Sequence, residues 1–122
     1  MTEIVFDSSF LMAVVDTPTT WFDDIVERLG KFDPLLPECV FLELQKLAAG
    51  RDKRSRTARV AVDISKGFKR LPCGSARVDD EVISEASARG AFVATTDAVL
   101  ASAARGAHLR VVSLRGGRVD VA

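Results

Sequence analysis

The chain has 122 residues, 48% of them hydrophobic, and its 17 basic and 17 acidic side chains give a formal net charge of zero. A chain of this size buries about two thirds of its unfolded surface, so we expect residues 1–122 to form one domain that needs no cross-links. No apolar run approaches the ~20 residues of a membrane span and no signal-like segment is present, which predicts a protein without membrane association.

Apolar spacing and turn residues predict strands that alternate with helices along the chain. In chain order the expected elements are a strand over 3–6, a helix or turn over 10–15, a helix over 18–29, a short strand or extended connection at 35–36, helices over 38–49 and 51–69, a brief strand over 70–73, a helix over 76–89, a strand over 91–95, a helix over 97–105, and strands over 109–114 and 118–121. Glycines follow most of these helices, where a helix commonly ends. The alternation predicts an α/β fold, a three-layer α/β/α sandwich around a mainly parallel sheet.

The two cysteines, Cys39 and Cys73, lie far apart and form no CxxC motif. This spacing predicts neither a zinc site nor a disulfide framework. We therefore expect unpaired thiols and a reducing, cytoplasmic setting.

Two carboxylates directly follow predicted strands. Asp7 ends the strand in "IVFDSS", and Asp97 follows the strand in "AFVATTD". Because the carboxyl ends of parallel strands meet at one edge of a sheet, we expect both side chains at that edge, where α/β proteins form their sites. The alternative is that each aspartate only caps the helix that follows it.

A third carboxylate lies on the apolar face of a predicted helix. In "PECVFLELQKL", Glu43 lies three residues after Val40 and four before Leu47, which places it among apolar side chains. A buried carboxylate needs a partner, typically a base or a metal. The alternative is that Glu43 lies at the exposed edge of the apolar face and needs none. Asp79 and Asp80 begin a later helix, and helical spacing alone does not choose between them.

Four segments in order resemble the PIN-domain family of metal-dependent ribonucleases, over nearly the whole chain. They are "IVFDSSFL", "PECVFLELQKL", "DEVISEASARGAFVATTD" and "LRVVSL". The resemblance implies four catalytic and metal-binding residues, namely Asp7, Glu43, Asp80 and Asp97. It selects Asp80 over Asp79 because hydrophobic residues follow Asp80 at the offsets expected of the family.

The resemblance also implies supporting roles for two hydroxyls. Thr95 corresponds to the hydroxyl that supports Asp97, and Ser9 occupies a position where many family members have Asn. Four carboxylates can converge only with cations, and oxygen ligands suit Mg²⁺ or Mn²⁺. The implied activity is endonucleolytic hydrolysis of RNA phosphodiesters by metal-activated water.

A basic stretch follows the Glu43 helix and supplies a surface for a polyanion. Its candidate RNA-binding residues are Lys46, Arg51, Lys53, Arg54, Arg56 and Arg59. Beside an acidic site, a basic rim favours phosphate contact, whereas a charge run alone is typical of a solvated surface.

The resemblance leaves two alternatives open. One is a non-catalytic PIN-like RNA-binding or scaffold module, although all four acidic positions are present. Within the nucleases, the chain is either a VapC-type toxin with an antitoxin as partner or an RNA-processing enzyme that acts on ribosomal precursors. An apolar face around Trp21 and Phe22 further suggests a homodimer.

Overall fold

A six-stranded sheet forms the centre of the computed structural model, which describes residues 1–74 and 77–122. Its strands are β1 (Thr2–Phe6), β2 (Phe32–Pro37), β3 (Lys69–Leu71), β4 (Phe92–Ala94), β5 (Val111–Arg115) and β6 (Arg118–Val121). The strand order is β3-β2-β1-β4-β5-β6, and only the β5–β6 pair is antiparallel. This confirms the mainly parallel sheet predicted from the alternation of elements.

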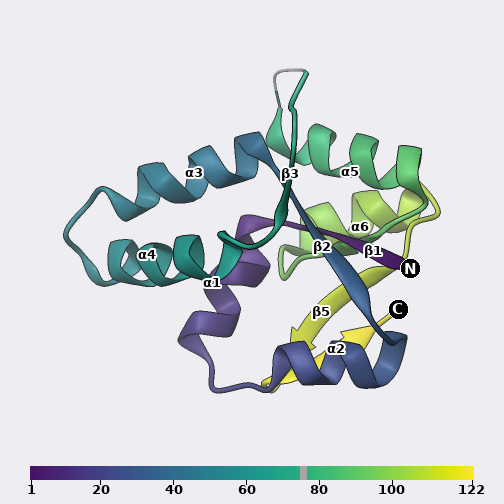
Figure 1. Cartoon of the computed structure of the whole chain (residues 1–122), viewed down its shortest axis with the longest axis horizontal. Helices are drawn as coiled ribbons and strands as arrows, with labels where there is room; N and C mark the ends of the chain where they lie inside the picture. The colour runs from purple at the N-terminus through teal and green to yellow at the C-terminus, as the bar shows by residue number, and fades with distance from the viewer. Residues whose placement is uncertain (75–76) are drawn as a thin grey trace.

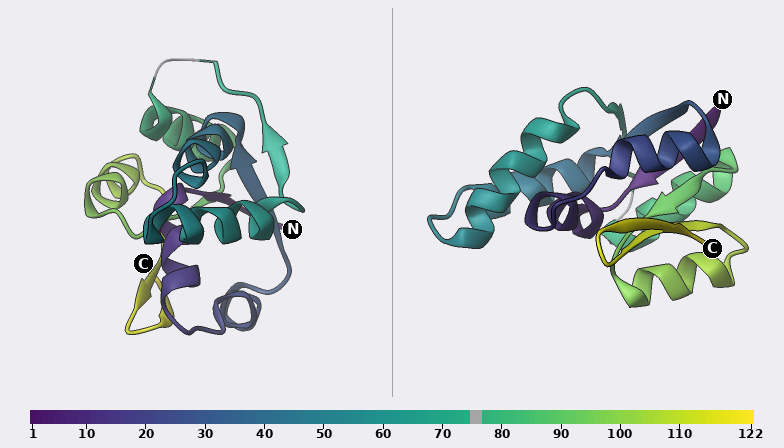
Figure 2. Two further views of the ribbon diagram at one scale, coloured as in Figure 1. Left: turned by 90° about the vertical axis from the view of Figure 1, so that its left-hand side faces the viewer. Right: turned by 90° about the horizontal axis from the view of Figure 1, so that it is seen from below.

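In the described part of the chain, six helices connect and cover the strands (Figure 1). They are α1 (Ser8–Asp16), α2 (Trp21–Leu29), α3 (Glu38–Ala48), α4 (Lys53–Ser65), α5 (Val78–Arg89) and α6 (Ala98–Gly106). Helices α1, α3 and α4 pack together, whereas α5 packs on β1, β4 and α6. Figure 2 shows these two groups on different sides of the strands, which completes the α/β/α sandwich. No helix in the described ranges is long and apolar enough to cross a membrane.

The carboxyl-terminal halves of two neighbouring strands, β1 and β2, are built from buried side chains. Ile4, Val5 and Phe6 of β1 have no exposed surface, and neither do Leu35 and Leu36 of β2. Such continuous apolar runs are typical of parallel strands covered on both faces. The buried core therefore fixes the carboxyl ends of these strands as a rigid edge.

The strand order reverses between β1 and β4, which pair in parallel. From β1 the chain continues outward to β2 and β3, and from β4 it continues outward to β5. One residue beyond the last paired residue of β1, the Asp7 N–H donates a hydrogen bond of 2.9 Å to the Ala94 carbonyl. A crevice at such a switch point, outside the carboxyl ends of the strands, is where open α/β sheets bind ligands.

The helix predicted over 51–69 is shorter in the structure and runs from Lys53 to Ser65. The Asp52 side chain accepts hydrogen bonds from the Ser55 N–H and hydroxyl, at 2.9 and 2.8 Å, and so begins the helix two residues later than expected. The start of the helix predicted over 76–89 lies outside the described residues, and its described part is α5.

The prediction of unpaired thiols is wrong, because Cys39 and Cys73 form a disulfide across a Cα–Cα distance of 6.0 Å. The register of the sheet explains the pairing. Pro37 of β2 lies opposite Leu71 of β3, and each cysteine lies two residues beyond its strand. Sequence spacing carries no information on this register, and the reducing setting inferred from free thiols loses its basis.

Candidate active site

Carboxylates from four separate segments line one pocket of about 470 Å³ at the switch point. The pocket is lined by Asp7, Ser8, Ser9, Met12, Ala13, Asp16, Glu43, Leu47, Arg54, Asp79 and Asp97. The acidic side chains come from the ends of β1 and α1, the middle of α3, the start of α5 and the residue before α6. Segments far apart in the sequence therefore contribute negative charge to the same cavity.

Asp7 is buried, with 5% of its surface exposed, and is held by two hydroxyls. Its Oδ2 atom accepts hydrogen bonds of 2.6 Å from Ser9 and 2.9 Å from Thr95. The Ser9 N–H also donates to Oδ2, at 3.4 Å, which makes Asp7 the N-cap of α1. All three hydrogen bonds go to Oδ2. Within the described chain, the other carboxylate oxygen, Oδ1, therefore has no hydrogen-bond partner from the protein.

Asp97 follows the same pattern at the next strand. Its Oδ1 atom caps α6 by accepting hydrogen bonds from the N–H groups of Val99 and Leu100, at 2.8 and 3.1 Å. Its own N–H donates to the Thr95 hydroxyl at 3.0 Å. Helix capping and a place on the pocket wall thus occur together at both aspartates, and capping uses only one oxygen of each.

Glu43 is half-buried on α3, and its carboxylate is hydrogen-bonded to a serine rather than paired with a basic residue. The Ser8 hydroxyl donates a hydrogen bond of 2.6 Å to Glu43 Oε1. Since Ser8 begins α1 directly after Asp7, this bond fixes the position of Glu43 relative to Asp7. The other oxygen, Oε2, has no recorded partner among the described residues.

Asp79, not Asp80, lies on the pocket wall, so the choice of Asp80 made from the sequence does not fit the geometry. Burial raises the pKa of Asp79, and the negative charges of Asp7, Asp97 and Glu43 raise it further. Asp80 is 69% exposed, and its Oδ2 atom lies 3.9 Å from Nε of Arg77. Neighbouring helix positions point about 100° apart, which is consistent with Asp79 lining the pocket while Asp80 points to solvent.

The chemistry of the pocket fits a hard divalent cation. Its acidic side chains offer only oxygen atoms, and none of them takes part in a recorded ion pair with a basic residue of the described chain. Within residues 1–74 and 77–122, no three acidic, histidine or cysteine side chains converge closely enough to form a complete protein cage for a metal. Mg²⁺ rarely needs such a cage, because it commonly keeps several waters and takes one or two carboxylates.

The basic residues predicted to contact RNA separate into different environments. Arg54 lines the acidic pocket, and Lys53 and Arg56 line a neighbouring hollow beside Asp16. Arg59 instead donates hydrogen bonds to the carbonyls of Ala48 and Gly50, at 2.8 and 3.0 Å.

The other two lie near the end of α3 and in the turn that follows it. Lys46 borders a groove between α3 and α5, and Arg51 is exposed beside α4. Of the six, Arg54 is the one that lines the acidic pocket itself.

Sequence reasoning missed Asp16 as a pocket residue. Ser9, Met12, Ala13 and Asp16 all line the pocket, and they follow the i, i+3, i+4, i+7 spacing of one helix face. That periodicity was available in the sequence. Asp16 Oδ1 also accepts a hydrogen bond of 2.8 Å from Thr57, which links α1 to α4.

Fold and pocket together define an α/β-sandwich protein with a carboxylate site at the switch point of a mainly parallel sheet. The chain belongs to the PIN-like domain family, whose model matches residues 4–117. The resemblance seen in the four sequence segments is thereby confirmed.

Solved structures show the same fold. The chain is similar to the PIN domain endonuclease Utp24, with a TM-score of 0.78, 24% identity, and coverage of 98% of this chain and 90% of that one. It is also similar to VapBC2 from Rickettsia felis bound to a DNA fragment from its promoter (TM-score 0.66, 12% identity, covering 98% and 100%). PAE2754 from Pyrobaculum aerophilum matches with a TM-score of 0.57 and 20% identity, covering 86% of this chain and 81% of that one. No curated protein matches the chain significantly by sequence.

Proposed function

We propose that this chain is a metal-dependent endoribonuclease in which residues 1–122 act as one nuclease domain. The observation that carries the proposal is the meeting of five carboxylates, from four separate segments, at the switch-point pocket. They belong to Asp7, Asp16, Glu43, Asp79 and Asp97. Capping and hydroxyl contacts use only one oxygen of Asp7, Asp97 and Glu43. The remaining oxygens are available for a cation and for a water molecule.

Asp7, Glu43, Asp79 and Asp97 would hold the Mg²⁺ or Mn²⁺, one or two of them directly and the others through its waters, with Asp79 in the place first assigned to Asp80. The bound cation supplies an activated water and charge stabilisation for phosphodiester hydrolysis. Ser9 and Thr95 hold the Asp7 carboxylate in one orientation through their hydrogen bonds to Oδ2. Ser8 does the same for Glu43.

A nucleic acid is the proposed substrate because a basic rim borders the acidic pocket, and the resemblance to the PIN-domain ribonucleases favours RNA. Arg54 lies on the pocket wall, where it can contact the phosphate next to the one being cleaved. Lys53 and Arg56 extend this positive edge along α4. Such contacts recognise the backbone and supply salt-dependent affinity without reading bases.

A cleavage assay tests the proposal. Wild-type protein should cleave single-stranded RNA when Mg²⁺ or Mn²⁺ is added, chelation should stop cleavage, and the Asp7→Asn variant should be inactive. The exposed Asp80→Asn variant is the matched control and should retain activity. RNA binding without cleavage by the wild type would instead support the non-catalytic module.

Two biological roles remain for such a nuclease, with different partners. A toxin would be neutralised by an antitoxin, and a processing enzyme would act on ribosomal precursors. Expression in cells distinguishes them. Growth arrest that Asp7→Asn relieves supports the toxin, whereas unprocessed ribosomal RNA on depletion supports the processing enzyme.

A further inference from the structure

The Cys39–Cys73 disulfide joins the two segments that carry Glu43 and Asp79. We propose that it is a positioning cross-link, which fixes the Asp79 side of the acidic pocket relative to the Glu43 side. The inference rests on the proposed nuclease function. It predicts that oxidised protein binds the catalytic cation more tightly than reduced protein.

On the α3 side, the disulfide and the site share one helix face. Cys39 and Glu43 are four residues apart, so they lie one turn above each other. Both border the groove between α3 and α5, which Val78 lines from the other side. Val78 directly precedes Asp79, so the cross-link and two pocket carboxylates border one continuous surface.

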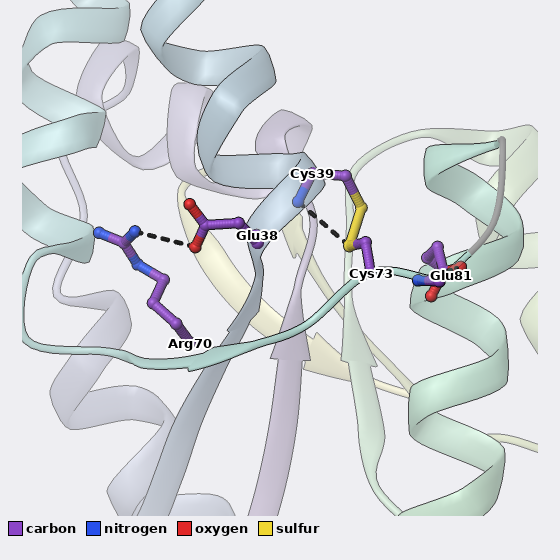
Figure 3. Close-up of a disulfide and its surroundings, with 6 residues drawn as sticks. Glu38, Cys39, Arg70, Cys73 and Glu81 are labelled. Carbon is purple, nitrogen blue, oxygen red and sulfur yellow. Dashed lines mark hydrogen bonds and ion pairs between the residues drawn. A yellow bond between two sulfur atoms is a disulfide. The ribbon is translucent and has the colours of Figure 1, made fainter.

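On the Cys73 side, the disulfide holds a segment that lies outside the sheet. Strand β3 ends at Leu71, and Cys73 lies beyond the ladder. The Cys39 N–H donates to Cys73 Sγ at 3.1 Å, and the next residue, Gly74, donates its N–H to Glu81 Oε1 at 3.0 Å. Figure 3 shows this order of contacts, from the start of α3 through the disulfide to Glu81 on α5.

Glu81 carries the connection to the site. It is buried, with 7% of its surface exposed, and lies two residues after Asp79 on α5. The first turn of α5 is therefore connected to α3 through Gly74 and the disulfide. Within the described chain, this is a second route to Asp79 besides the packing of α5 on the sheet.

Reduction should loosen the Asp79 side more than the Glu43 side. A dithiol reductant donates two electrons and two protons, the S–S bond breaks, two cysteine thiols form, and the dithiol becomes a cyclic disulfide. The start of α3 keeps its other anchors, namely the pairing of Pro37 with Leu71 and the 3.3 Å ion pair between Glu38 and Arg70. The segment at Cys73 and Gly74 loses its cross-link to α3.

Hydrogen exchange tests the cross-link without depending on cleavage. In metal-free buffer, amides of residues 77–82 should exchange several-fold faster after treatment with dithiothreitol, whereas amides of β1 and α3 should be unchanged. The Cys39→Ser/Cys73→Ser double variant should resemble the reduced protein and should not respond to dithiothreitol. If the double variant fails to fold, the wild type under reductant, monitored by circular dichroism, provides the same comparison.

Metal dependence provides the second readout. The Mn²⁺ concentration that gives half-maximal cleavage should rise several-fold on reduction of the wild type, with little change in the maximal rate. Equal exchange at residues 77–82 in both redox states would overturn the inference, as would global unfolding on reduction or two free thiols in oxidant-treated protein. An inactive wild type with redox-dependent exchange would instead reject the proposed nuclease and leave the cross-link supported.

Discussion

The Thr95 hydroxyl connects the two aspartates at the ends of β1 and β4. It donates a hydrogen bond of 2.9 Å to Asp7 Oδ2 and accepts one of 3.0 Å from the Asp97 N–H. Thr95 is fully buried, and Ser9 Oγ lies 3.0 Å from its hydroxyl. One side chain thus sets the spacing between two of the five pocket carboxylates.

Replacing Thr95 with valine should damage both stability and the site. The change keeps the volume but leaves the Asp97 N–H without its acceptor and Asp7 without one donor, which costs about 1–3 kcal/mol when such groups are buried. Urea denaturation of metal-free protein measures the loss, and RNA cleavage should fall with it. Thr95→Ser retains the hydroxyl and should recover most of both, and equal stability of the valine variant and the wild type would contradict the argument.

Asp79 and Asp80 form a matched pair for testing the site. Only Asp79 lines the pocket, whereas Asp80 is exposed beside Arg77. Asp79→Asn should therefore lower cleavage by about tenfold or more, as expected when a group that holds or orients a metal ligand is lost. Asp80→Asn should stay near the wild-type rate. The reverse ranking would restore the assignment made from the sequence.

The sequence predicted the parts of the site that depend on local pattern. A carboxylate within three residues after a strand identifies Asp7 and Asp97, because the carboxyl ends of parallel strands meet at one edge of the sheet. The periodicity of α3 likewise identified Glu43. The family resemblance supplied the order of the segments, and the match of residues 4–117 to the family model confirms it.

The features that the sequence did not determine depend on packing between distant segments. The choice between Asp79 and Asp80 requires the rotation of α5 about its axis, which its short apolar stripe does not set. The Cys39–Cys73 disulfide requires the register of β2 against β3, where Pro37 meets Leu71. Neither quantity is encoded in the spacing of residues along one element.

Arg54 and Arg59 should differ in what their loss affects. Arg54 lies on the pocket wall, so Arg54→Gln should weaken RNA binding and reduce the salt dependence by about one phosphate contact. Arg59 instead satisfies the carbonyls of Ala48 and Gly50 at the end of α3. Arg59→Gln should lower the unfolding free energy by about 1 kcal/mol with a smaller effect on RNA affinity. Fluorescence anisotropy at several salt concentrations, together with denaturation curves, checks both, and equal losses of affinity would reject the distinction.

Asp52 should stabilise α4 in a pH-dependent way. Hydrogen bonds from the Ser55 hydroxyl and N–H lower the pKa of Asp52 below its usual 3.8. A carboxylate with a depressed folded pKa contributes stability above its unfolded pKa, and the contribution is lost as the pH falls through the folded value. Asp52→Ala should therefore lower the melting temperature at neutral pH, and the difference from the wild type should shrink below pH 3.8. A difference that stayed constant into acid would argue for a purely steric role.

In the absence of metal, ionised Asp79 should lower the free energy of unfolding, because it is partly buried among other carboxylates. Burial and then the charges of Asp7, Asp97 and Glu43 raise its pKa above 3.8, so in the folded state it holds its proton to higher pH than in the unfolded state. Stability from this group is therefore lost as the pH rises through the folded pKa, and below 3.8 the carboxyl is neutral in both states.

Asp79→Asn removes that titration. In chelator-treated protein the variant should be more stable than the wild type at neutral pH, and the gain should disappear below pH 3.8. Adding Mn²⁺ should reverse the order, because the cation neutralises the charges that destabilise the wild type and binds the variant more weakly. Thermal melts across this pH range, with and without Mn²⁺, measure both effects. A variant less stable than the wild type in chelator at neutral pH would show that Asp79 supports the fold rather than the metal site.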